Sequence, residues 1–260
     1  MADKRLRKGK NVSSDKIMTM TDLASPKIRT ALQRIMFCAG RLPESCSNEA
    51  KEILENAYRI LNVSTSFEEY FSIITGEYRL EKQLMEVSSF LEDLCGKLLP
   101  YMTERGIAFS FSIPKEQIVA SLDRQRFQSA LLNILKNSVK YTAPGNRIFL
   151  RATATKRYVK ILIRDKGTGM YDEVLEHCCE PFFSRDGGEG MGFGLTLARH
   201  FVKESGGKFE IKSKLDSGTV VEMKLPLYHG GSENSEVSSY FGNRQEAAPE
   251  LIKAAFGGME

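Results

Sequence analysis

The 260-residue sequence contains no tryptophan, only three histidines and no long apolar run. No window approaches the roughly 18 apolar residues that a membrane-spanning helix needs. The opening MADKRLRKGK is followed by polar residues rather than by the apolar segment of a secretory signal. We therefore expect a cytoplasmic protein without an integral membrane segment. Any function that needs an imidazole must use His177, His200 or His229.

Cysteine is also scarce, and its spacing excludes two common uses of this residue. The five cysteines are odd in number and include no C-x-x-C pair, so they predict neither a disulfide scaffold nor a zinc site. Reduced thiols in the cytoplasm fit best. The adjacent Cys178 and Cys179 leave two interpretations, a redox-active pair or two buried thiols, and the second is favoured.

Charge is nearly balanced, with 37 Lys+Arg against 33 Asp+Glu, but it is unevenly placed. Residues 1–14 are basic and predict a flexible arm; contact with nucleic acid or anionic lipid is the alternative, and no nucleic acid partner is expected. Residues 229–260 are acidic and rich in Gly, Ser and Asn, which predicts a disordered tail with one short helix over 249–256.

Two helical stripes define a first domain over residues 15–77. Apolar or small side chains recur at helical spacing over 15–42 and again from about Asn48 to Thr75, with a loop between them and Gly76 placed to end the second helix. A single hairpin of this kind exposes its apolar seam. Pairing two hairpins into a four-helix bundle would bury the seam, so a homodimer is favoured over packing on the rest of the same chain.

From residue 78 to 228 strands and helices alternate, which predicts an α+β fold: a two-layer α/β sandwich of about 150 residues. Expected strands lie at 78–87, 107–113, 118–122, 147–153, 158–165, 208–213 and 219–227. Expected helices begin at a Ser89/Glu92 capping box, at the Asp123 cap and at Phe193, with a helix fragment after 171. The domain is long enough to bury its own core.

Three polar or glycine-rich segments of this domain are candidates for chemistry. The helix after Asp123 carries LLNILKNSVKYT, in which two amides and an ammonium share one face. DKGTGM directly follows an apolar strand, so its carboxylate is placed to accept hydrogen bonds from a ligand amino group. GMGFGL opens a helix, whose first N–H groups favour phosphate. Each segment alone is weak evidence; the three in this order are specific.

The order of these three segments resembles that in the ATP-binding domain of bacterial sensor histidine kinases. The resemblance extends to four further motifs: EPFF, Gly206-Gly207, SGT and a terminal LPL. This nucleotide-binding fold is shared with gyrase-type and chaperone ATPases. The preceding hairpin is similar to the family's dimerisation and phosphoacceptor domain, so the likeness spans 15–228. It implies a two-component phosphorelay protein that uses ATP and Mg²⁺, forms a homodimer, and has a response regulator or a partner kinase as its protein partner.

The resemblance also implies a role for each matching residue. Asn137 would ligate Mg²⁺, Asn133 would line the phosphate site, Lys140 would meet phosphate, and Tyr141 would pack near the adenine. Asp165 would accept from the adenine amino group. Residues 184–191 would form a lid over ATP, anchored by Phe182 and Phe183, and Met191 stands where a small polar residue is usual. The full expected ATP-binding set is Asn133, Asn137, Lys140, Tyr141, Asp165, Gly167, Gly169, Phe183, Gly190, Gly192, Gly194, Leu195 and Thr219.

The phosphoacceptor histidine of the family is missing. The stretch SPKIRTAL matches the family's His-acid-x-Arg-Thr-Pro-Leu pattern, but Pro26 stands at the histidine and Lys27 at the acid. A proline has no nucleophile and a lysine cannot replace the neighbouring base, so autophosphorylation at this site is not expected. Pro26 also suits the first turn of a helix better than its interior.

Three functions follow. The first is a histidine-kinase-like phosphotransferase that passes phosphate from Mg-ATP to a protein acceptor. The alternative is an ATP-binding pseudokinase or adaptor that dimerises and binds a response regulator or partner kinase without autophosphorylation. The third, an ATP hydrolase or serine kinase of the wider fold class, is disfavoured because Asn133 stands where those relatives carry a glutamate base.

Overall fold

The computed structural model describes residues 26–183, 192–229, 252, 255 and 256. These residues divide into two compact units, with the boundary between Tyr78 and Arg79. The sequence predicted a domain boundary between residues 77 and 78. The basic arm 1–14 lies outside the described residues.

The first unit is a helical hairpin. A helix over 26–39 is followed by the short 3-10 helix η1 (Glu44–Cys46) and by α2 (Ser47–Thr75). Gly76 ends α2 in the left-handed conformation, with φ 77°, as expected for a glycine at this position. Arg29 Nη2 lies 3.2 Å from Glu68 Oε2 and joins the two helices. Pro26 is the first described residue of its helix, and the part of the expected helix before it lies outside the described residues.

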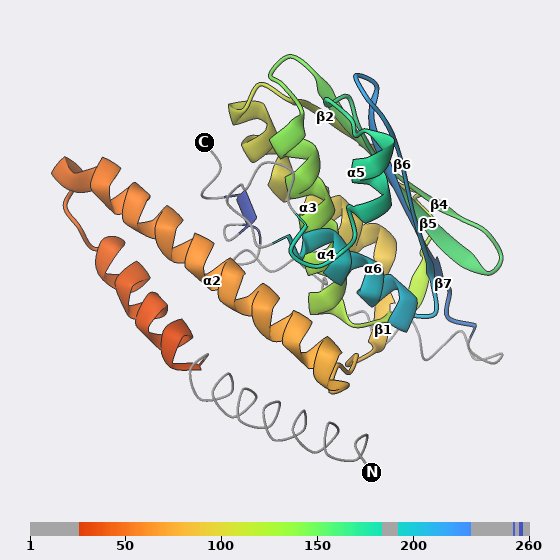
Figure 1. The fold of residues 1–260 in the computed structure, drawn as a ribbon, viewed down its shortest axis with the longest axis horizontal. Helices are drawn as coiled ribbons and strands as arrows, with labels where there is room; N and C mark the ends of the chain where they lie inside the picture. Colours follow the sequence, from red (N-terminus) through yellow and green to blue (C-terminus); the bar gives the residue numbers. More distant parts are fainter. Residues whose placement is uncertain (1–25, 184–191, 230–251, 253–254, 257–260) are drawn as a thin grey trace, which may run out of the picture. The chain divides into compact units, whose positions relative to one another are not determined.

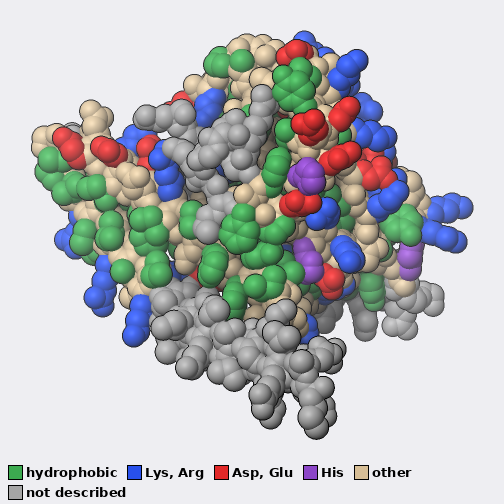
Figure 2. All heavy atoms as spheres, viewed as in Figure 1, with side chains coloured by type: hydrophobic (Ala, Val, Ile, Leu, Met, Phe, Trp, Pro, Cys, Tyr) green, Lys and Arg blue, Asp and Glu red, His purple; other side chains and the backbone are tan. Residues whose placement is uncertain are grey.

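The hairpin buries few of its own apolar side chains. Leu32, Ala39 and Ala57 are buried. Of the expected seam, Ala57 is buried and Phe67 and Phe71 are half-buried, whereas its described isoleucines are exposed. Figure 2 shows apolar side chains on the hairpin face turned to the viewer. The exposed large apolar residues of this unit are Ile28, Ile35, Phe37, Leu42, Ile53, Ile60 and Ile74.

The second unit is an α+β sandwich built on a five-stranded sheet with the order β2-β4-β5-β7-β6. Only β2 and β4 run parallel; the other neighbours are antiparallel. Figure 1 shows α3, α4 and α6 on one face of this sheet. The strands are β2 (Ala108–Ser112), β4 (Arg147–Ala154), β5 (Tyr158–Asp165), β6 (Lys208–Lys214) and β7 (Gly218–Pro226). The helices are α3 (Val87–Glu104), α4 (Arg124–Tyr141), α5 (Asp172–His177) and α6 (Gly194–Glu204).

A second, two-stranded antiparallel sheet consists of β1 (Gln83–Glu86), which directly precedes α3, and β3 (Val119–Leu122), which directly precedes α4. The strand expected at 78–87 is therefore only four residues long. The expected capping box at Ser89 is also wrong. Glu86 caps α3 instead, because its carboxylate accepts hydrogen bonds from the backbone N–H groups of Ser88 and Ser89 at 3.0 and 2.6 Å. By contrast, the expected Asp123 cap is confirmed, with Oδ1 3.0 Å from Arg126 N.

Three described positions of the C-terminal tail lie within 249–256, the segment where one short helix was expected in an otherwise disordered tail. Ile252, Ala255 and Phe256 are helical and buried, and they belong to the same apolar core as α3 and the sheet. The Phe256 ring lies 6.1 Å from the ring of Tyr101, and Arg105 Nη2 donates to the Phe256 carbonyl at 3.1 Å. This end of the chain is therefore part of the second unit's packing.

Candidate functional site

The candidate site begins at the last residue of β5. Val159, Ile161 and Ile163 alternate with more exposed positions and are buried. Asp165 continues this alternation, and because successive strand residues face opposite ways, its carboxylate also points into the buried layer. A carboxylate 6% exposed at such a position needs hydrogen-bond partners.

Three donors hold the Asp165 carboxylate. Oδ1 accepts from the backbone N–H groups of Gly167 at 3.0 Å and Thr219 at 2.9 Å. Oδ2 accepts from the hydroxyl of Ser138 at 3.2 Å. Burial raises the pKa of Asp165 above its ordinary value, and the hydrogen bonds from Gly167, Thr219 and Ser138 oppose that rise. An ionised carboxylate has about four acceptor positions, so this one retains capacity for a further donor.

The glycines of this region allow backbones to meet. A Cβ on Gly167 would lie 2.4 Å from the Tyr141 carbonyl oxygen, and one on Gly169 (φ +66°) would lie 2.0 Å from that of Lys214. A Cβ on Gly218 would lie 2.2 Å from the Asp165 carbonyl oxygen. Gly167 and Gly169 belong to the expected ATP-binding set. Together with Gly218, they make close contacts within the protein that join the ends of α4, β5, β6 and β7.

The polar face of α4 borders this carboxylate. Asn133 and Asn137 are half-buried and one turn apart, Tyr141 is half-buried, and Lys140 is exposed with its Nζ 5.0 Å from the centre of the Tyr141 ring. The Tyr141 carbonyl accepts from Thr168 N at 3.1 Å. The end of α4 is thereby tied to the turn that follows Asp165.

The first turn of α6 lies against the same face of α4. A Cβ on Gly194 would come 3.4 Å from the side chain of Asn133. No side chain of the described residues caps α6, and its first turn contains no acidic residue. The backbone N–H groups of Gly194 and Leu195 therefore lack the partner that an N-cap side chain gives. An anion is favoured at such a helix start.

The segment before α6 is anchored by close contacts. Gly192 (φ +73°) has no space for a Cβ, which would lie 2.6 Å from the Phe183 carbonyl oxygen. The rings of Phe182 and Phe193 meet edge to face at 4.8 Å, and Phe182 itself has a positive φ of 64°. Gly190, Met191 and the expected lid over 184–191 lie outside the described residues.

The structure thus brings most of the expected residues to one end of the sandwich. Asn133 meets Gly194, Tyr141 meets Gly167, and Asp165 meets Thr219. Ser138 and Gly218 also belong to this cluster, although neither was among the expected site residues; both stand inside motifs quoted above. Ser138 directly follows Asn137, and Gly218 is the centre of SGT; a small residue at each place was the available signal.

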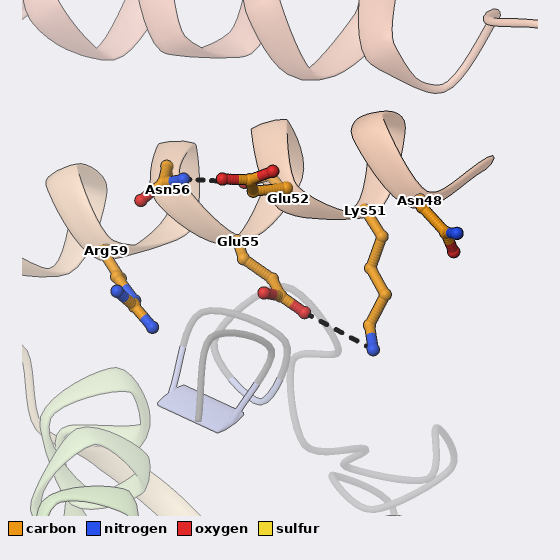
Figure 3. Close-up of a pocket in the computed structure, with 6 residues that line it drawn as sticks. All are labelled: Asn48, Lys51, Glu52, Glu55, Asn56 and Arg59. Carbon is orange, nitrogen blue, oxygen red and sulfur yellow. Dashed lines mark hydrogen bonds and ion pairs between the residues drawn. The ribbon is translucent and has the colours of Figure 1, made fainter. Parts of the chain in front are cut away.

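A hollow in the first unit does not form part of this site. Figure 3 shows a hollow along α2 of the hairpin, lined by charged and amide side chains that include the Lys51–Glu55 ion pair.

No group of three or more His, Cys, Asp or Glu side chains in the described part of the chain is arranged to hold a metal ion. Within the same residues, no helix has the length and apolar character needed to cross a membrane.

Comparison with known proteins gives a consistent result. Residues 122–229 match the family described as histidine kinase-, DNA gyrase B- and HSP90-like ATPase. The sensor protein SrrB of Staphylococcus aureus is 25% identical over 214 residues, which are 78% of this chain and 36% of SrrB. The histidine protein kinase DivJ of Caulobacter vibrioides is 25% identical over 215 residues, with the same two coverages. The chain therefore spans about a third of the length of these relatives.

Solved structures support the fold. Full-length ShkA in complex with AMPPNP superposes with a TM-score of 0.66 at 21% identity, over 82% of this chain and 47% of that one. The histidine kinase AdeS of Acinetobacter baumannii gives a TM-score of 0.55 at 14% identity, over 78% and 96%. Residues 122–229 are a domain of the histidine kinase-, DNA gyrase B- and HSP90-like ATPase family, and the chain is homologous to sensor histidine kinases.

Proposed function

We propose that the second unit binds ATP with Mg²⁺ and passes its γ-phosphate to a protein acceptor, as a histidine-kinase-like member of a two-component phosphorelay. The observation that carries this proposal is the Asp165 carboxylate, which is buried, held on three sides and still able to accept another hydrogen bond. An adenine amino group is a donor suited to that position. Gly167, Gly169 and Thr219 shape the wall around it.

The phosphate end of the nucleotide is assigned to α4 and α6. The uncapped first turn of α6, at Gly194 and Leu195, offers backbone N–H groups to phosphate oxygens. Gly192 lies beside it, and Lys140 supplies a positive charge. Phe183 and Gly190 complete the set that we assign to ATP binding, with Asn133 lining the phosphates and Tyr141 beside the adenine.

The residues fit Mg²⁺ in the manner usual for this ion. Mg²⁺ keeps several waters and binds through one or two protein oxygens plus substrate phosphates, so a dedicated cluster of carboxylates is unnecessary. The half-buried amide of Asn137, one turn from Asn133, is the protein ligand we assign. The ion would neutralise charge between the phosphates, while Asn137 and the α6 N–H groups orient them.

The acceptor lies in a different protein on this proposal, because Pro26 occupies the family's acceptor position. Replacing Pro26→His and Lys27→Glu together restores the expected acceptor pattern. After incubation with ATP labelled at the γ-phosphate, we expect acid-labile label on the restored chain and none on the wild type. A Pro26→Ala, Lys27→Glu chain is the matched control, and adding Asn137→Ala should remove the label.

The same experiment separates the adaptor alternative. A restored chain that binds Mg-ATP but stays unlabelled would contradict phosphotransfer and favour an ATP-binding adaptor. Label on the wild type that disappears when one of His177, His200 or His229 is changed would contradict the assignment of the acceptor to another protein. Neither His177 in α5 nor His200 in α6 lies in the hairpin.

We further propose that the hairpin forms a homodimer. Ile53, Ile60 and Ile74 of α2 are 40%, 51% and 59% exposed, and they repeat at the spacing of a helix-packing seam. A second hairpin would cover them in a four-helix bundle. Light scattering should give a dimer for the wild type and a monomer for the Ile53→Glu, Ile60→Glu variant. A wild-type monomer at micromolar concentration would contradict this proposal.

A further inference from the structure

Two adjacent cysteines lie between α5 and the segment that leads to α6. The Cys178 and Cys179 sulfurs are 4.0 Å apart. The Cys178 sulfur is also 3.2 Å from the Leu175 carbonyl oxygen, so its S–H has two acceptors in reach. Cys178 is half-buried and Cys179 is buried. The other three thiols sit singly on three different elements: Cys38 on the helix over 26–39, Cys46 in η1 and Cys95 in α3.

The surroundings of the pair favour a negative charge on one sulfur. The hydrogen bond from Cys178 lowers the pKa of Cys179, and the positive charge of Arg199 lowers it further, against the cost of burial. The same hydrogen bond raises the pKa of Cys178. Burial instead raises the pKa of the Cys95 thiol to about 12. Because a thiolate is the form that binds metals and attacks electrophiles, Cys179 has a chemistry that Cys95 lacks.

The separation of the sulfurs suits chelation better than disulfide formation. A disulfide needs sulfurs about 2.05 Å apart and Cα atoms at least about 4.4 Å apart, whereas the Cα atoms of neighbouring residues are about 3.8 Å apart. Two thiolates that each bind one tetrahedral ion at about 2.3 Å lie about 3.8 Å from one another. The observed 4.0 Å is close to this second value. A pyramidal trivalent centre holds its two sulfurs at a narrower angle, so it would draw them slightly closer together.

We propose that Cys178 and Cys179 form a vicinal dithiol site that chelates one soft, thiophilic centre, such as a trivalent arsenical. With an organic arsenic oxide, two arsenic–sulfur bonds form and the arsenic–oxygen double bond breaks. The two thiol protons leave with the oxygen as one molecule of water. Arsenic stays trivalent, so no oxidant or reductant takes part.

The site is joined to α6 by the carbonyl group of Cys179. This oxygen accepts from the hydroxyl of Thr196 at 3.0 Å and from Arg199 Nη2 at 2.9 Å. Cys179 is 7% exposed, so a bridging ligand can reach its sulfur only if residues 178–179 shift. That shift weakens both hydrogen bonds near the start of α6. The effect on nucleotide affinity rests on the proposed function; the dithiol site does not.

Phenylarsine oxide is a direct probe of the site, used on the full chain in its reduced form. In a large excess of mercaptoethanol, a monothiol, we expect intact-mass spectrometry to find one bound phenylarsenic group, which dimercaptopropanol removes. Cys178→Ser and Cys179→Ser should each lose the adduct, and Cys46→Ser should keep it. An adduct that survives in both single variants, or wild type that retains none, would overturn the proposal.

Peptide mapping covers the case in which a serine variant fails to fold. The wild-type adduct should map to the peptide that contains residues 178–179; any other peptide would overturn the proposal.

The link to α6 is tested by ATP affinity. Wild type treated with phenylarsine oxide should bind ATP at least roughly threefold more weakly than untreated wild type. The Cys46→Ser, Cys178→Ser variant should have the same ATP affinity with and without treatment. An adduct at 178–179 with unchanged ATP affinity would contradict the link to α6. A chain that binds no ATP before treatment contradicts the proposed function alone.

Discussion

The hydroxyl of Ser138 on α4 donates a hydrogen bond to Asp165 Oδ2 at the end of β5, across 3.2 Å. It ties the helix that carries Asn133 and Asn137 to the carboxylate that we assign to adenine. The other carboxylate oxygen is held by backbone groups of two different segments, at Gly167 and Thr219. The position of Asp165 is therefore fixed from three directions, and only the Ser138 contact comes from a side chain.

Ser138→Ala should weaken nucleotide binding without unfolding the domain. The variant leaves Oδ1 with both backbone donors but removes the donor on Oδ2, so the pKa of Asp165 should rise further and its carboxylate should be less well oriented. A hydrogen bond to a charged group contributes about 1.5–3 kcal/mol. Isothermal titration with ATP should give a roughly tenfold weaker affinity, while Ser110→Ala, at an exposed site in β2, should match the wild type.

Gly167→Ala should destabilise the second unit, because its Cβ would lie 2.4 Å from the Tyr141 carbonyl oxygen. Backbone rather than a flexible side chain occupies that space, so the turn after Asp165 must move. Gly96→Ala is the matched control: its Cβ has no neighbour within 4 Å inside α3, and alanine in a helix is better than glycine by about 0.5–1 kcal/mol. Thermal melts should move in opposite directions, and equal melting temperatures would contradict the described backbone contact.

Acid should affect binding and stability at Asp165 in opposite ways. Burial raises the pKa of this carboxyl in the folded chain, so the folded state takes up the proton at a higher pH than the unfolded state. As the pH falls through that pKa, protonation stabilises the fold at this residue but removes the charged acceptor that the adenine needs. As the pH is lowered, ATP affinity should decrease. Over the same range, the free energy of unfolding of the wild type should increase relative to that of Asp165→Asn.

Phe256→Ala should destabilise the second unit although it lies near the end of the chain. The ring is 1% exposed, is 6.1 Å from the Tyr101 ring and sits in the main core. Removing a buried phenylalanine costs about 3–5 kcal/mol. Denaturant unfolding should show that loss, whereas Leu99→Ala, at a 37% exposed site on α3, should cost much less. A loss no larger than that of Leu99→Ala would contradict the packing of the tail.

The parts of the fold that could be predicted are those that depend on interactions between residues close together in the sequence. Asp123 caps α4 through a residue three positions away, Gly76 ends α2, and period-two alternation locates β5 and its carboxylate. The cap of α3 could not be found this way. Glu86 is oriented partly by Ile118 N, 3.0 Å from its Oε1, and that contact exists only because β1 pairs with β3.

The same limit explains what was missed in the candidate site. Ser138 becomes important only through Asp165, 27 positions later, and Gly218 through the backbone of the same residue. Phe256 packs against residues of α3, and its carbonyl accepts from Arg105, 151 positions away in sequence. The sequence predicted a short helix over 249–256 but not its burial, because the local sequence contains no sign of a distant apolar site.

The central claim is that Asp165 recognises the nucleotide, and Asp165→Asn tests it most directly. The asparagine amide keeps an oxygen for Gly167 and Thr219 and can donate to the Ser138 hydroxyl, so the fold should be retained. It places a donor where a carboxylate would accept from the adenine. Isothermal titration with Mg-ATP should show binding by the wild type and by Asp93→Asn, and at least roughly tenfold weaker binding by Asp165→Asn. Equal affinities for all three chains would contradict the claim.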